Sequence, residues 1–161
     1  MGLAGWSGSG KTTLLVELLP ALRRRGLVVS TVKHAHHEFD IDRPGKDSFR
    51  HREAGAAEVL IASSRRWALM HENTGEDEPG LDALLARLQP VDLVIVEGFK
   101  RHAHPKIEIH RASVGKPLLA PEDPDIIAVA TDNPGLAVPL PLLDLGNGQA
   151  IAAFIIERLG L

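Results

Sequence analysis

Apolar residues along this chain fall into two kinds of run, short continuous or β-branched runs and longer runs with helical spacing. The short runs predict strands at residues 1–5, 27–33, 57–62, 67–71, 91–96, 107–110, 126–130 and 140–145. The helical spacing predicts helices at residues 11–25, 81–88 and 149–159. A further short helix, capped by Asp47 or Ser48, is expected to end at Gly55.

Strands that alternate with helices are typical of an α/β protein with a mostly parallel sheet. We expect a P-loop NTPase-like three-layer fold with helices on both faces of the sheet, and residues 1–161 as a single nucleotide-binding domain. In such a fold, ligands bind at the carboxyl ends of the strands.

The segment GWSGSGKT, residues 5–12, lies between the first predicted strand and the first predicted helix. Its spacing is that of a phosphate loop, in which glycines let successive backbone N–H groups point at phosphate oxygens. Lys11 is placed to reach the β- and γ-phosphates, and the Thr12 hydroxyl is placed to bind Mg²⁺. The predicted nucleotide contacts in this loop are Ser7, Gly8, Ser9, Gly10, Lys11, Thr12 and Thr13.

A carboxylate follows the buried run VDLVIVEG at residues 91–98. Glu97 stands where many P-loop proteins place the acid that faces magnesium, so a role at the metal is favoured. The alternative is that Glu97 caps the next segment while Gly98 turns the chain. Asp92, at the other end of this strand, is interpreted as structural.

The loop FDIDRPGKDS, residues 39–48, resembles a switch region, because its acids could reach magnesium, a metal-bound water or an attacking water. These acids are Asp40, Asp42 and Asp47. Solvated loop acids, with Asp47 as a helix cap, are an equally good interpretation of each acid taken alone.

Other charged side chains near the presumed phosphate edge have open roles. Lys33, Lys100 and Arg101 would meet a second anionic substrate or a partner, or lie in water. We interpret the histidines as polar loop residues or phosphate contacts and not as ligands of a transition metal, because no tight carboxylate or cysteine partner completes a zinc signature. They are His34, His36, His37, His102, His104 and His110.

The composition of the chain argues against nucleic acid and membranes as partners. The chain has no cysteine and a formal net charge of −3, without the broad basic field that nucleic-acid binding requires. It has no apolar stretch of the roughly 20 residues that cross a bilayer. We therefore expect no nucleic-acid partner, no membrane partner and a cytoplasmic location.

Three motifs in order resemble the MobB family of molybdopterin-guanine dinucleotide biosynthesis adapter proteins: GWSGSGKTTL, VKHAHHEFDIDRPGKDSFRHREAGA and DLVIVEGFK. The resemblance runs over nearly the whole chain, and the long middle motif is the most specific. It implies a GTP-binding protein with weak GTPase activity, usually a homodimer, that assists the molybdopterin guanylyltransferase attaching GMP to molybdopterin. By the same resemblance, Asp42 and Asp47 look like acidic switch residues. It implies that Asp42 helps Thr12 and Glu97 to bind magnesium, and that Asp42 and Asp47 act with Lys11 and Glu97 in catalysis. The implied cofactors are GTP and Mg²⁺.

Recognition of guanine has no obvious motif, since the N-K-x-D signature of Ras-like GTPases is absent. The nearest substitute is Asp132, which follows the strand IIAVA and could accept hydrogen bonds from guanine N1 and N2. An ordinary turn in TDNPG is almost as good an interpretation.

Two other functions fit the phosphate loop. One is a small-molecule kinase or ATP-dependent ligase in which Lys33 or Lys100 binds an acidic acceptor. The other is a binding module whose nucleotide orders a surface for a partner without hydrolysis. Arg43 and Arg50 are candidates for an arginine finger.

Overall fold

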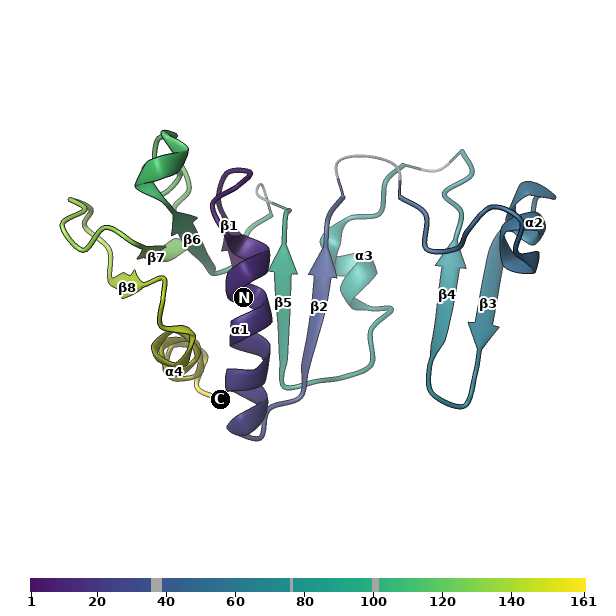
Figure 1. Ribbon diagram of the computed structural model, residues 1–161, viewed down its shortest axis with the longest axis horizontal. Helices are drawn as coiled ribbons and strands as arrows, with labels where there is room; N and C mark the ends of the chain where they lie inside the picture. The colour runs from purple at the N-terminus through teal and green to yellow at the C-terminus, as the bar shows by residue number, and fades with distance from the viewer. Residues whose placement is uncertain (36–38, 76, 100–101) are drawn as a thin grey trace. The chain divides into compact units, whose positions relative to one another are not determined.

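The computed structural model describes residues 1–35, 39–75, 77–99 and 102–161. The chain divides into two compact units, the first formed by Met1–His34 with Leu85–Leu161 and the second by Ala35–Leu84. Each unit has its own sheet (Figure 1). None of the helices in the described ranges has the length and apolar character needed to traverse a bilayer.

The first unit is built on a six-stranded sheet in which every neighbouring pair is parallel. Its order is β2-β5-β1-β6-β7-β8. The strands are β1 (Gly2–Ala4), β2 (Val29–Lys33), β5 (Leu93–Glu97), β6 (Lys106–His110), β7 (Ile126–Thr131) and β8 (Leu142–Asp144). The expected strands are thus confirmed within a few residues at each end, and so is the mostly parallel α/β class. Because β1 lies between β5 and β6, the segments that follow these three strands meet at one edge of the sheet.

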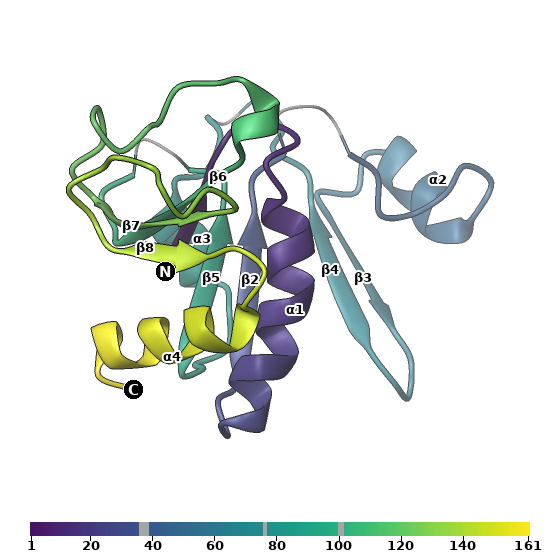
Figure 2. The same cartoon turned by 60° about the vertical axis from the view of Figure 1, so that its left-hand side comes forward.

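Helices α1 (Lys11–Arg24) and α4 (Gly148–Leu159) pack against each other and cover one face of this sheet (Figure 1, Figure 2). Buried leucines of α1 at helical spacing pack against apolar side chains of the central strands. Apolar residues of α4 pack into the same core. This core contains Leu3, Leu14, Leu18, Leu22, Ile95, Ile107, Ile109, Ala128, Ile151 and Ile155. Its burial fixes where α1 begins, directly after the glycine-rich loop.

The opposite face of β6 carries charged side chains that are fully covered. Glu108 is 0% exposed and accepts hydrogen bonds from the backbone N–H groups of Leu119 (2.8 Å) and Ala120 (2.9 Å). Lys106, 2% exposed, forms ion pairs with Asp123 at 3.0 Å and Asp125 at 3.4 Å. These bonds hold the connection between β6 and β7 against the sheet, because buried charges are tolerated only when they are paired.

The second unit contains α2 (Asp47–Glu53) and an antiparallel hairpin of β3 (Glu58–Ala62) and β4 (Trp67–His71). The strands are where the sequence predicted them, but they form their own sheet. The four residues between them are too few for the crossover that parallel strands need, so only a hairpin is possible. Helix α3 (Leu81–Leu85), which was expected to reach residue 88, is shorter than predicted.

The Glu108 carboxylate gives a test of how the β6–β7 connection is held. Replacing Glu108 by Ala leaves two partly buried N–H groups without their acceptor, and we expect the free energy of unfolding to fall by about 2–4 kcal/mol. Urea denaturation measures this change. The matched control is Glu122→Ala in the same connection, whose side chain is exposed and whose loss is expected to have little effect.

Candidate functional site

The loop after β1 has the backbone shape that its glycines allow. Gly5, Gly8 and Gly10 have positive φ angles of 146°, 80° and 98°. At Gly5 there is also no room, because a Cβ atom would lie 2.6 Å from the Ile109 carbonyl oxygen and 2.7 Å from Ser9 Oγ. A Cβ at Gly8 would meet nothing within 4 Å, so this side of the loop is open. The loop is therefore tight against β6 and open at Gly8.

Lys11 lies against the start of this loop. Its Nζ donates hydrogen bonds to the carbonyl oxygens of Gly5 (3.0 Å) and Trp6 (2.9 Å). The ammonium group and the N-terminal N–H groups of α1 are therefore at the same place, and both attract a polyanion. Next in the loop, the indole N–H of Trp6 donates to the Pro117 carbonyl at 2.8 Å, so the loop is also tied to the β6–β7 connection.

Thr12 and Glu97 face each other across the edge of the sheet. Glu97 ends β5, next to β1, and its Oε1 lies 3.5 Å from Thr12 Oγ1. A hydroxyl and a carboxylate are oxygen donors of the kind that Mg²⁺ prefers, so these two residues fit the magnesium role predicted for them. The two side chains are close enough to face one ion, and their binding of magnesium stays a prediction.

The turn after Glu97 is conformationally strained. Gly98 has φ 99°, and a Cβ there would lie 2.5 Å from the Cβ of His34. Phe99 also has a positive φ, 48°, which costs a non-glycine residue about 1–3 kcal/mol. The rings of His34 and Phe99 are in contact, with centroids 4.8 Å apart. This packing keeps the chain turned at the point where Glu97 faces Thr12.

Arg111 was not predicted, yet it contacts two parts of the site. It follows β6 directly, its Nε donates to the Ser9 carbonyl at 3.2 Å, and its Nη1 lies 3.3 Å from Asp132 Oδ2. Its position directly after a predicted strand is visible in the sequence, but its contact with the loop depends on β6 lying next to β1 in the sheet. Asp132 follows β7 and is 40% exposed.

A hollow of about 510 Å³ lies beside Asp132, at the carboxyl ends of β7 and β8. It is lined by Thr131, Asp132, Pro134, Leu142, Leu143 and Asp144. The Thr131 hydroxyl accepts a hydrogen bond from the Asn133 N–H at 3.1 Å, which turns the chain sharply after Asp132. The turn that was the alternative interpretation of TDNPG is therefore present, and it coexists with a cavity.

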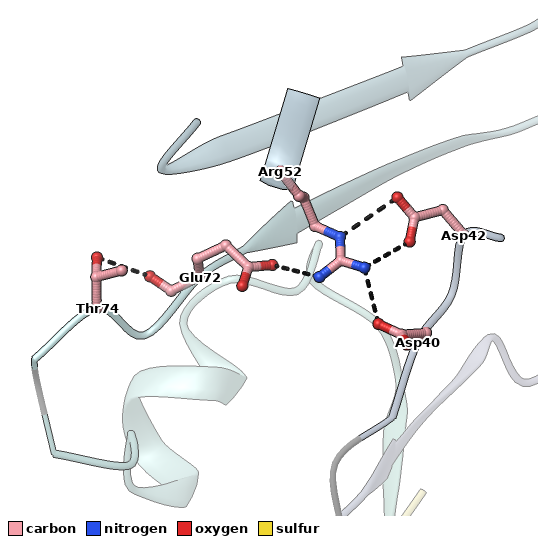
Figure 3. A network of polar contacts seen from close by, with 5 residues as sticks. All are labelled: Asp40, Asp42, Arg52, Glu72 and Thr74. Atoms are coloured by element: carbon pink, nitrogen blue, oxygen red, sulfur yellow. Dashed lines mark hydrogen bonds and ion pairs between the residues drawn. The ribbon is translucent and has the colours of Figure 1, made fainter. Parts of the chain in front are cut away.

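In the second unit, the Asp42 carboxylate forms an ion pair with Arg52 (Figure 3). Arg52 donates to both oxygens of Asp42, at 2.8 Å and 3.3 Å, and also pairs with Asp40 at 2.8 Å and Glu72 at 3.4 Å. The Asp42 side chain is 2% exposed. The hydrogen bonds from Arg52 lower the pKa of the Asp42 carboxyl below its usual value, although desolvation opposes them.

The remaining predicted residues are placed as follows. Asp47 is the first residue of α2, after Lys46 at the N-cap, so the predicted cap by Asp47 or Ser48 is wrong. As the first acid of the helix, Asp47 still lies at the favourable end of its dipole. The catalytic roles of Asp42 and Asp47 stay predictions. His36, His37, Lys100 and Arg101 lie outside the described residues.

The glycine-rich loop between the first strand and helix of a parallel sheet, with Lys11 and Thr12 at the helix start and Glu97 opposite, defines a P-loop nucleotide-binding protein. Comparison with known proteins narrows the class. The family model of molybdopterin guanine dinucleotide synthesis protein B, MobB, matches residues 1–132. The chain belongs to this family.

Known proteins align with nearly the full length of this chain. The chain is 44% identical over 160 residues to the molybdopterin-guanine dinucleotide biosynthesis adapter protein of Escherichia coli K12, covering 98% of this chain and 91% of that one. It is 46% identical over 158 residues to the adapter protein of Haemophilus influenzae, covering 96% and 86%. A crystal structure of molybdopterin-guanine biosynthesis protein B aligns with a TM-score of 0.78 at 30% identity, covering 98% and 97%.

Arg52 provides a test within the second unit. We expect Arg52→Met to raise amide hydrogen exchange in α2 and in β3 and β4, because Asp42 would be left covered without its cation. The stabilisation from Asp42 is complete above the usual pKa of 3.8 and is lost as the pH falls through the lower folded value. Exchange read by mass spectrometry measures both effects.

Arg50→Met is the control, because Arg50 is exposed and lies on the same helix. Equal exchange in the Arg52 and Arg50 variants would contradict a stabilising role for the arginine.

Proposed function

We propose that this protein is a GTP-binding adapter with weak GTPase activity that assists attachment of GMP to molybdopterin in the cytoplasm. The observation that carries the proposal is the arrangement of Lys11, Thr12 and Glu97 around the glycine-rich loop. Membership of the MobB family supports it, as do similar proteins named molybdopterin-guanine dinucleotide biosynthesis adapter proteins. The whole chain, residues 1–161, would act as one nucleotide-binding domain.

Triphosphate binding falls to the loop and the start of α1. Backbone N–H groups from Ser7 to Thr13 replace the water around the phosphate oxygens, as in other P-loops. Lys11, held by two carbonyl oxygens of the same loop, adds a positive charge at the start of α1. The open side at Gly8 leaves space for the ligand.

Magnesium would be held by Thr12 and Glu97, while the metal role predicted for Asp42 stays a prediction. The bound ion neutralises charge on the phosphates. Glu97 sits at the end of a central strand and beside a strained turn, so its carboxylate is positioned by the sheet. Asp42 and Asp47 are proposed as switch acids that orient water, and slow turnover suits an adapter.

The guanine base is proposed to bind in the hollow beside Asp132. Its walls combine apolar side chains, Leu142, Leu143 and Pro134, with a carboxylate at the rim. Such a lining suits a flat base with donor groups on one edge, because N1–H and the N2 amino group of guanine donate to a carboxylate. Adenine lacks this pair of donors, so a GTP preference over ATP is expected.

We propose that the protein forms a homodimer through the exposed apolar face of the β3–β4 hairpin. Leu60 is paired directly with Leu69 and Ala62 with Trp67, and these side chains lie on one face of the two strands. Leu60 is 61% exposed, Trp67 64% and Leu69 41%. Contiguous exposed apolar side chains mark an interaction surface, and the same face of a second copy offers a self-complementary partner.

Molybdopterin guanylyltransferase is the proposed enzyme partner.

Calorimetric titration with magnesium nucleotides tests the proposed site. The wild-type protein is expected to bind GTP more tightly than ATP. Lys11→Ala should weaken GTP binding about 10- to 100-fold, the effect of losing hydrogen bonds to a charged group. The control is Arg23→Ala, a cation at the other end of α1. Unchanged affinity in a folded Lys11→Ala variant would contradict the phosphate role, and equal GTP and ATP affinities would remove the guanine assignment.

The proposed dimer is tested by charging the hairpin face. Trp67→Lys should weaken self-association at least about 30-fold, because a central aromatic contact is lost and a charge is brought into an apolar surface. Sedimentation equilibrium measures the association constant. Val16→Lys is a matched change at an exposed apolar residue of α1, and it should leave association intact. A Trp67→Lys protein that associates like the wild type would rule out this face.

A further inference from the structure

We propose that Arg111 is the positioning residue that makes guanine recognition depend on the phosphate loop. It would hold the Asp132 carboxylate beside the base pocket in a fixed relation to Ser9. The inference rests on the proposed GTP site and adds a residue that the family resemblance did not supply.

One guanidinium group carries both contacts. Nε donates to the Ser9 carbonyl at 3.2 Å, and Nη1 pairs with Asp132 Oδ2 at 3.3 Å. The guanidinium is planar and rigid, so the direction of one bond fixes the direction of the other. A lysine at this position has a compact ammonium group on a flexible chain and cannot impose the same relation.

The loop is shaped to receive this side chain. Gly10 has φ 98°, and a Cβ there would come within 3.2 Å of Arg111 Nε and 3.5 Å of Nη2. The guanidinium therefore lies next to the backbone of Gly10, whose carbonyl accepts the first hydrogen bond of α1 from Leu14 at 2.9 Å. Arg111 contacts the phosphate loop at the residue where the loop becomes a helix.

Stability alone is a poor explanation of the Arg111–Asp132 pair. Both side chains are more than a third exposed, at 37% and 40%, and exposed ion pairs contribute little to folding. What the pair does is restrict the Asp132 carboxylate, which lines the hollow at the ends of β7 and β8. A restricted carboxylate favours guanine over adenine, because less rotational freedom is lost on binding and only guanine has the donors that use the carboxylate.

The experiment measures the ratio of GTP to ATP affinity by calorimetry with magnesium. Wild-type protein is compared with Arg111→Ala, Arg111→Lys, Asp132→Ala and the double variant Arg111→Ala/Asp132→Ala. We expect Arg111→Ala to lower the ratio about 10-fold, the size of one hydrogen bond to a charged group. Arg111→Lys should recover only part of it, and Arg111→Ala should have little further effect once Asp132 is removed.

Arg158→Ala, at an exposed arginine of α4, is the control, and circular dichroism with thermal unfolding checks the fold of each variant. If Arg111→Ala weakens GTP and ATP equally, the arginine acts on phosphate or loop shape alone and the proposal is overturned. An unchanged ratio in Arg111→Ala, with GTP preferred by the wild type, also overturns it while the GTP site stands. A wild-type protein without GTP preference removes the guanine assignment and this inference with it.

Discussion

The close approach of Gly5 to β6 is the constraint on which the site depends. The Ile109 carbonyl oxygen and the Ser9 hydroxyl occupy the space that a side chain at Gly5 would need. Because the chain can turn there, α1 begins at Lys11, with its leucines in the core and its N-terminus at the sheet edge. A larger residue would push the loop off β6 and move Thr12 away from Glu97.

The parallel pairing of the strands brings the other polar groups of the site to the same edge of the sheet. Glu97, Arg111 and Asp132 belong to segments far apart in the chain, yet they end or follow β5, β6 and β7. In a parallel sheet the carboxyl ends of neighbouring strands lie together, so the strand order alone brings these groups beside the phosphate loop. Buried Glu108 contributes indirectly, because it fixes the connection that leaves β6 just after Arg111.

Local patterns were sufficient for the strands and the long helices, although α3 is shorter than expected and the cap of α2 was wrong. They also placed Lys11 and Thr12 at the start of α1 and Glu97 at the end of β5. Arg111 could not be found in this way, because its contact with Ser9 depends on which strand lies next to β1. The partner of Asp42 was hidden for a similar reason: only the folded second unit brings Arg52 to it. The antiparallel pairing of β3 and β4 could have been predicted from their four-residue connection. That the pair forms a sheet of its own could not, because it depends on how the rest of the chain folds.

Trp6 occupies an unusual place, inside the glycine-rich loop and hydrogen-bonded through its indole to the Pro117 carbonyl. Lys116 lies near its ring, 5.8 Å from Nζ to the centroid. The indole therefore joins the glycine-rich loop by one hydrogen bond to the segment between β6 and β7. A displacement of either one would change the surroundings of a fluorescent side chain and act on the other.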